Sequence, residues 1–236
     1  MKKSKLILMA GLAGFTMLGT TYAQTTTTTT GSNTNPGGVY LRGSFSLANI
    51  STNGDGTVNN SNNLSTFNAG FIGDLPLNDM FSLQSGLFLQ GKGAKASGDN
   101  YTYKFRPYYL QVPLNFAIKV PMGADSRFFI AAGPFVSMGL FGKSTLETNI
   151  AGATTTTKED IKFESIDGED PDDARLDRLK RWEFGINGTA GIEAGRLLVG
   201  VTYDWGLSKI NQVSENQNND KNKYRTLSLN LGFRLN

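Results

Sequence analysis

Hydrophobic and polar residues alternate along much of this chain. In the stretch RPYYLQVPLNFAIKV, residues 106–120, every second residue from Tyr108 to Val120 is apolar. Strict alternation is typical of a β-strand with one apolar face. At about 3.3 Å per residue the apolar run spans roughly 40 Å, well beyond an average strand. The first question is therefore which medium meets so long an apolar face.

The same alternation recurs in seven other stretches, so the sequence predicts eight strands. Their apolar sets lie within residues 39–47, 67–71, 81–89, 106–120, 128–140, 182–192, 197–207 and 227–235. Short turns at 75–79, 121–125 and 194–196 alternate with long polar loops at about 48–63, 92–106, 141–181 and 208–223. Short turns at one end and long loops at the other, with an even strand count, are typical of transmembrane β-barrels. Beyond residue 37 no stretch is apolar for long enough to form a membrane-spanning helix.

Alternation alone does not separate a membrane barrel from a soluble barrel with an apolar interior, such as a lipocalin. The polar face of the predicted strands carries mostly Gly, Ser, Thr and Asn, for example Ser44, Asn68 and Thr189. A wall exposed to water is normally rich in Lys and Glu, whereas the narrow lumen of eight strands needs small side chains. The sequence therefore predicts an all-β fold over residues 38–236. The predicted fold is an eight-stranded antiparallel up-and-down transmembrane β-barrel, with three short periplasmic turns and four long extracellular loops.

Two features of the predicted strands follow from a barrel in lipid. Aromatic residues near strand ends are expected to form the interfacial girdles: Tyr108, Phe128, Trp182, Trp205, Tyr224 and Phe233. The alternative is that they are core aromatics of a soluble sandwich. Pro113 lacks the N–H that a ladder needs, so we expect it at a bulge or a slipped hydrogen bond, with its ring facing the lumen.

The N-terminal 23 residues have the features of a signal peptide. The basic MKKSK precedes the apolar LILMAGLAGFTMLG, and TYA before Gln24 is a small-residue cleavage site. We expect cleavage after Ala23, and Gln24 in place of Cys argues against a lipoprotein anchor. The Thr-rich segment 24–37 has nothing to bury, so it is interpreted as a flexible periplasmic tether or as a remnant without a role.

Composition excludes several kinds of chemistry. The 236 residues include neither His nor Cys, so disulfides, thiolate or imidazole metal sites and His- or Cys-based catalysis are impossible. Removing the leader's three lysines leaves 20 basic residues against 20 acidic ones, which gives no electrostatic footprint for nucleic acid. We expect no cofactor and no enzymatic activity.

Five segments together resemble a known family. They are SGLFLQGKG, YYLQVPLNFAIKV, AAGPFVSMGL, FGINGTAGIEAGRLLVGVTYDWGLSKI and RTLSLNLGFRLN. They are similar to successive motifs of the PorT-like "porin family" outer-membrane β-barrels of the Bacteroidota, over nearly all of residues 38–236. Gln111 replaces an acidic residue often found there, and the chain ends in FRLN rather than in an aromatic residue. The resemblance implies a Gram-negative outer-membrane location and the barrel assembly machinery as a partner. It usually implies no known ligand.

Charged residues on the polar face are candidates for a lumen site. Five of them are expected inside the barrel near its periplasmic end: Arg42, Asp74, Lys119, Glu193 and Arg234. Because buried charges need partners, we interpret them as an ionic plug. The alternative is a proton or ion path. Together with Phe88, Phe129 and Phe135 the plug predicts a lumen that does not conduct.

The loop 141–181 holds ten of the chain's 20 acidic residues. Within it, DGEDPDD offers carboxylates for Ca²⁺ from Asp167, Glu169, Asp170, Asp172 and Asp173. Their spacing is not that of an EF-hand loop, so no metal site is assigned. A solvated acidic loop with one short helix near DPDDARLDRLKR, beginning at Pro171, is the favoured interpretation.

Basic residues of the second loop are candidates for contacts with lipopolysaccharide phosphates, or else they are ordinary rim charges: Lys92, Lys95, Lys104 and Arg106. The leading functional hypothesis is a non-enzymatic outer-membrane barrel with a structural, adhesive or secretion-accessory role through its extracellular loops. Its partners would be outer-membrane lipid and an unknown surface ligand or secretion component. The alternatives are a small channel, which eight strands disfavour, a soluble periplasmic lipocalin-like carrier and an outer-membrane enzyme.

Overall fold

The computed structural model describes residues 35–51, 61–150, 153–164, 178–210 and 223–235. Within these ranges it contains β-strands and no helix long and apolar enough to cross a membrane. The strands are β1 (Gly38–Ser51), β2 (Ser61–Asn62), β3 (Leu64–Pro76), β4 (Phe81–Gly91), β5 (Ala94–Ser97), β6 (Tyr101–Pro121), β7 (Ser126–Ile150), β8 (Ala153–Asp160), β9 (Lys162–Glu164), β10 (Arg178–Lys180), β11 (Trp182–Ala194), β12 (Leu197–Gly206) and β13 (Lys223–Arg234).

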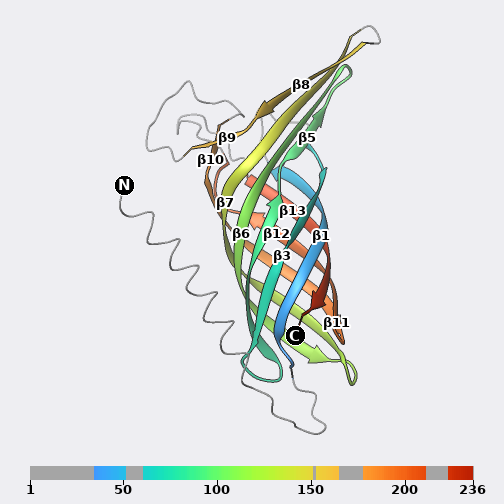
Figure 1. The fold of residues 1–236 in the computed structure, drawn as a ribbon, viewed down its shortest axis with the longest axis vertical. Helices are drawn as coiled ribbons and strands as arrows, with labels where there is room; N and C mark the ends of the chain where they lie inside the picture. The colour runs from blue at the N-terminus through green and yellow to red at the C-terminus, as the bar shows by residue number, and fades with distance from the viewer. Residues whose placement is uncertain (1–34, 52–60, 151–152, 165–177, 211–222, 236) are drawn as a thin grey trace, which may run out of the picture.

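Eight of these strands close into a barrel (Figure 1). Around the ring the order is β6, β4, β3, β1, β13, β12, β11 and β7, and β7 pairs again with β6. Every neighbouring pair is antiparallel, including the pair β1–β13, which joins the first and last strands of the chain. The predicted eight-stranded antiparallel up-and-down barrel is confirmed.

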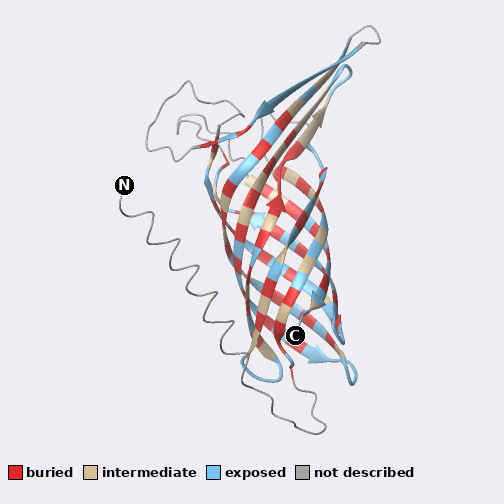
Figure 2. Cartoon of the chain, in the orientation of Figure 1, coloured by how far each residue is buried: buried red, intermediate tan, exposed pale blue. Residues whose placement is uncertain are grey.

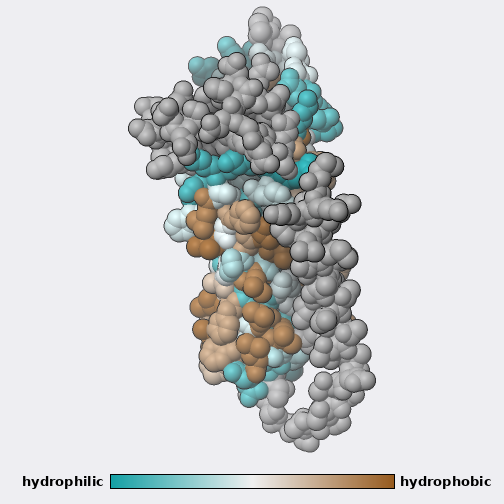
Figure 3. Space-filling view, turned by 90° about the vertical axis from the view of Figure 1, so that its left-hand side faces the viewer, coloured by the Kyte–Doolittle hydropathy of each residue, from teal (hydrophilic) through white to brown (hydrophobic). Residues whose placement is uncertain are grey.

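Buried and exposed residues alternate along each strand, as the striped ribbons of Figure 2 show. On β6, Leu114 is 50% exposed whereas its neighbour Asn115 is 3% exposed. The exposed side chains of the wall are apolar, and on the face shown in Figure 3 they gather in a brown band with hydrophilic residues above and below it. A wall that is apolar outside and polar inside is the pattern of a barrel in lipid, because a soluble carrier would need the reverse.

Pro113 interrupts the β4–β6 ladder without shifting it. Ser85 pairs with Leu114 and Phe88 with Gln111, so the register is the same on both sides and no residue is inserted. Pro113 is buried, and its carbonyl accepts a hydrogen bond from Ser85 Oγ at 2.9 Å. Of the two expected arrangements, the bulge is wrong at Pro113. The ladder lacks hydrogen bonds there because proline has no N–H to donate.

The irregularity in β6 and β7 lies further along. Tyr108 pairs with Phe141 and Tyr109 with Gly139, which leaves Leu140 as an extra residue in β7. The bulge puts the adjacent residues Leu140 and Phe141 on the same, exposed side. Beyond it the strands leave the ring.

Above the barrel, the parts of β6 and β7 beyond the bulge continue as an open antiparallel sheet with β2, β5 and β8 (Figure 1). We call this sheet the raised sheet and its strands the raised strands. The predicted loops at 92–106 and 141–181 are therefore wrong over most of their described residues. Segments such as KSTLETN are polar on both faces, so they carry no hydrophobic alternation, yet hydrogen bonding to their neighbours extends the ladder. The helix expected near residues 170–181 lies mostly outside the described residues, and its described end, Arg178–Lys180, is the strand β10.

Candidate functional site

The inward-facing residues form three polar layers and an apolar cap along the barrel axis. We number the layers from the end with short turns. Each layer combines residues from strands on different sides of the ring, so none is visible as a cluster in the sequence.

The first layer is an ion cluster. Lys119 of β6 pairs with Asp74 of β3, and its Nζ lies 2.8 Å from Glu193 Oε1 of β11. The three side chains are 0%, 1% and 3% exposed. A lysine between two carboxylates compensates the charge of both in a lumen where neither meets bulk water, as an ionic plug requires.

The structure places the two predicted arginines differently. Arg234 lies at the short-turn rim, opposite Tyr40 in the β1–β13 register, and is half-buried. Arg42 lies further up the lumen, with its guanidinium 4.2 Å from the centre of the Phe88 ring. The prediction of one five-membered plug is wrong for Arg42, because its position on β1 brings it to the level of Phe88 and Asp204 instead.

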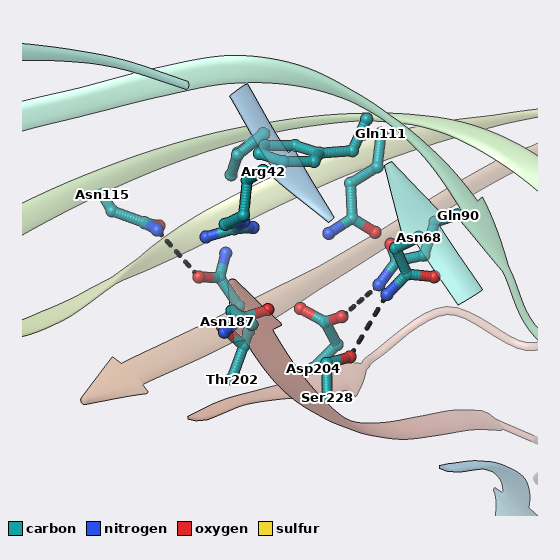
Figure 4. A pocket seen from close by; sticks show the side chains of 12 residues that line it. Arg42, Asn68, Gln90, Gln111, Asn115, Asn187, Thr202, Asp204 and Ser228 are labelled. Carbon is teal, nitrogen blue, oxygen red and sulfur yellow. Dashed lines mark hydrogen bonds between the residues drawn. The ribbon is translucent and has the colours of Figure 1, made fainter. Parts of the chain in front are cut away.

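The second layer surrounds Arg42 with amides and one carboxylate (Figure 4). Gln90 donates a hydrogen bond to Asp204, and Asn115 donates one to Asn187 at 2.9 Å. The free volume among these side chains is about 10 Å³, which is about the size of one water molecule. Side chains therefore fill most of the lumen at this level.

The third layer is a second ion pair, which the sequence analysis did not anticipate. Lys92 Nζ lies 2.5 Å from Glu183 Oε2, with side chains 1% and 5% exposed. The ammonium also lies 4.6 Å from the centre of the Phe135 ring and 5.5 Å from that of Tyr109, within the range of cation–π attraction. The prediction that Lys92 contacts lipopolysaccharide is therefore wrong, because its charge is neutralised inside the barrel.

A signal for the position of Lys92 was present in the sequence. Even-numbered residues of β4 from Ser82 to Gln90 face inward, and Lys92 continues this series by two residues. Its backbone N–H still donates to Pro107 O at 2.9 Å, so the ladder extends to it. Extending the alternation one step past the last apolar residue would have placed Lys92 in the lumen. The identity of its partner Glu183, 91 residues away, would not have followed.

An apolar cap covers the third layer. It joins residues of the barrel rim to residues of β9 and β10, the small parallel sheet above the barrel mouth. Its buried members are Ile50, Ala94, Phe105, Tyr109, Ile161, Phe163, Leu179, Ile210 and Tyr224. Tyr224 is 2% exposed, so its assignment to the outer aromatic girdle is wrong. The hydroxyl of Tyr109 lies 3.4 Å from that of Tyr224, and its ring packs edge-on against Phe163.

The other predicted site residues lie either outside the lumen or outside the residues that the structure describes. Lys95, Lys104 and Arg106 are half-buried residues of β5 and β6 on the sheet above the barrel. Lys104 pairs with Glu147 at 2.8 Å. The proposed Ca²⁺ ligands of 167–173 lie outside the described residues. Within the described ranges, no cluster of three or more acidic side chains suits a metal ion.

The charged and polar side chains of the lumen interact mainly with one another. Each described buried charge of the first and third layers faces an opposite charge at bonding distance. The polar groups of the second layer bond largely to one another, as Ser46 does to Ser228 and Thr189 to Thr202, both at 2.8 Å. Groups that satisfy one another in this way stabilise a closed barrel.

Comparison with known proteins agrees with this architecture. Residues 22–212 match the family described as "Outer membrane protein beta-barrel domain". The chain belongs to this family. It is therefore an outer-membrane β-barrel protein, and its short turns and raised strands correspond to the periplasmic and extracellular ends of such barrels.

No curated protein matched the chain. Among solved structures it is similar to Ail, the attachment invasion locus protein of Yersinia pestis, with 13% identity over 84% of this chain and 98% of that one, at a TM-score of 0.40. A structure of Ail with the heparin analogue sucrose octasulfate gives 14% identity, the same coverages and a TM-score of 0.40. Neisserial surface protein A gives 10% identity over 83% and 96% of the two chains, also at 0.40. Likeness at this level leaves the function to be argued from this chain's own residues.

Proposed function

We propose that this protein is a non-conducting, non-enzymatic barrel that acts as an adhesive surface protein through the sheet it raises above the outer membrane. The observation that carries the proposal is the ordered extension of β6, β7 and β8 beyond the ring, joined strand by strand in continuous register. Rigid scaffolds commonly display recognition surfaces in this way. The filled lumen favours this role over that of a channel, because the three layers and the cap lie in series along any path through it.

Two finer assignments belong to the same proposal. The motifs quoted above support membership of the PorT-like group, and the leader that ends at Ala23 supports export by signal-peptide cleavage. A structural or secretion-accessory role would use the same raised sheet. It would predict loss of envelope integrity or of secretion, rather than loss of adhesion, when the sheet is shortened.

Shortening the β7–β8 hairpin tests the adhesive role. Glu147 and Thr156 are directly paired, so residues 148–155 can be replaced by Asn-Gly, which forms a two-residue hairpin turn. This leaves the cap residues Phe163 and Leu179 in place. Cells that display the full chain should be retained on protein-coated and polysaccharide-coated surfaces above cells without it, and the shortened variant should lose that retention.

The control is folding of the shortened barrel, shown by heat-modifiable gel mobility of the purified outer membrane. A folded variant with full retention would overturn the adhesive proposal. Loss of heat-modifiable mobility would assign the hairpin a structural role instead. A second shortening, of residues 98–101 at the β5–β6 turn, separates the contribution of the β7–β8 hairpin from that of the sheet as a whole.

A further inference from the structure

One face of the raised sheet is basic. The register aligns Lys95 of β5, Lys104 of β6, Thr145 of β7 and Lys158 of β8 in one row across four strands. The next row on the same face aligns Arg106, Lys143 and Asp160. We call the five cations the basic face: Lys95, Lys104, Arg106, Lys143 and Lys158. The sequence analysis did not single out Lys143 or Lys158, because they lie 37 residues or more from their row partners on β6.

The basic face continues the lipid-facing wall and not the lumen. Along β6, Phe105 and Tyr109 are 3% and 1% exposed and point inward, so Arg106 and Tyr108 between them point outward. On β7, Ser144 is 6% exposed and inward, which turns Lys143 outward. Each cation therefore stands on the side of the sheet that, lower down, meets hydrocarbon.

An aromatic cluster marks the level at which hydrocarbon ends. The Tyr108 ring lies 5.1 Å from that of Phe141 and 5.9 Å from that of Phe67, all on the outer surface. Aromatic girdles sit at the boundary between acyl chains and headgroups. Arg106 and Lys104 precede Tyr108 on β6 by two and four residues, which places them within about 7 to 13 Å of the girdle along the strand. This is the depth of lipid headgroups.

The charges on this face are unbalanced. Its described acidic residues are Glu147, which is bound to Lys104 at 2.8 Å, and Asp160, which lies opposite Lys143 in the register. Two carboxylates therefore stand against five cations. In the described part of the chain, no ion pair joins Lys95, Arg106 or Lys158 to a carboxylate, although an Arg106 nitrogen approaches Ser65 O at 3.5 Å. These groups are available to bind anions.

We propose that the basic face binds the phosphates of lipopolysaccharide in the outer leaflet, and so holds the raised sheet upright on the membrane. Clustered cations at headgroup depth attract anionic headgroups. The row geometry suits a ligand with several phosphates, because Lys95, Lys104 and Lys158 lie on separate strands of a rigid sheet. The proposal rests on the outer-membrane location and not on the adhesive role.

The test compares two double variants of the full chain. In K95Q/K158Q two cations of the basic face are neutralised, both from the row that contains Lys104. In K209Q/K223Q the same charge is removed from a lysine that follows β12 and a lysine of β13, neither of which belongs to the raised sheet. Protein folded in neutral detergent is titrated with fluorescent lipopolysaccharide, and binding is followed by anisotropy. Both variants must retain heat-modifiable gel mobility.

We expect the first variant to bind at least about tenfold more weakly than the unmodified protein, and the second to stay within about twofold of it. Diphosphorylated lipid A should compete, whereas its dephosphorylated form, inorganic phosphate and phosphatidylglycerol should compete at least about tenfold less well. Equal losses in the two variants would show ordinary rim charge and overturn the proposal. Equal competition by phosphatidylglycerol would also overturn it, by showing a site for any anionic lipid.

Discussion

Lys92 and Lys95 are three residues apart in the sequence, yet they meet opposite environments. Lys92 is fully buried against Glu183, whereas Lys95 lies half-buried on the basic face above the membrane. The difference arises because alternation carries Lys92 into the lumen, and the strand is then interrupted at Gly93 before β5 begins. Residues of the same type close together in the chain therefore have different roles.

This contrast predicts very different costs for the same substitution. Lys92→Met should lower the free energy of unfolding by about 3 to 5 kcal/mol, because Glu183 is left buried without its partner. Lys95→Met should change it by about 0.5 kcal/mol or less. Urea unfolding of the protein in lipid vesicles measures both. The double variant K92M/E183Q should recover most of the loss, and a similar small effect of Lys92→Met and Lys95→Met would contradict the buried pair.

At the scale of elements, the junction of β4 and β5 determines how the wall becomes the raised sheet. Gly93 has a φ of +124°, a conformation that residues with a side chain rarely adopt. A Cβ at this position would lie 1.8 Å from Phe105 O. Because that oxygen belongs to the backbone of the paired strand, it cannot move aside without disturbing the ladder.

Gly93→Ala should therefore lower the free energy of unfolding by about 1 to 3 kcal/mol through backbone strain alone. Gly43→Ala is the matched control, since an added Cβ there meets no atom within 4 Å. It should be neutral or stabilising by up to about 1 kcal/mol. Urea unfolding in lipid vesicles measures the stability of both variants. A Gly93→Ala variant as stable as Gly43→Ala would show that the junction tolerates rearrangement.

The raised strands also show why element lengths were underestimated from the sequence. The segment KSTLETN in β7 and the Thr-rich segment of β8 are mostly polar on both faces, so the hydrophobic signal that defines a strand elsewhere is absent. Four consecutive threonines in β8, all exposed, are a strand-propensity signal that does not depend on alternation. Pairing with β6 and β8 then supplies the hydrogen bonds that keep β7 extended.

At the scale of the whole molecule, the three polar layers and the cap act in series. The ion pairs of Lys119 and Lys92 are separated along the axis by the packed layer around Arg42, where the free volume is about 10 Å³. Any conducting path would have to disrupt all of these levels together. We therefore expect the lumen to stay closed when any one of these levels is weakened.

We predict that the reconstituted protein gives no stable nanosiemens steps in planar bilayers. The variant F163A/L179A, which weakens the cap, should also give none, because the charged layers beneath it remain intact. A well-characterised general porin in the same bilayers serves as the positive control. Stable steps from the unmodified protein would show that the lumen opens and would restore the channel hypothesis.

The sequence by itself determined the local properties of this protein. Alternation with a period of two assigns each residue to one face from its neighbours alone, so Leu114 could be placed outward and Asn115 inward without any tertiary information. The strand number, the short turns and the apolar outer wall follow from the same local rule. Absence of His and Cys fixed which chemistries are impossible.

Only the tertiary structure decided which inward residues meet. The register of each strand against its neighbours sets the height of every side chain around the ring, and it moved Arg42 away from Lys119 while bringing Glu183 to Lys92. The cap arose in the same way, because Phe163 and Leu179 pack onto Tyr109 and Tyr224 from distant parts of the chain. Contacts of this kind depend on the closure of the whole barrel, so no local pattern in the sequence shows which residues make them.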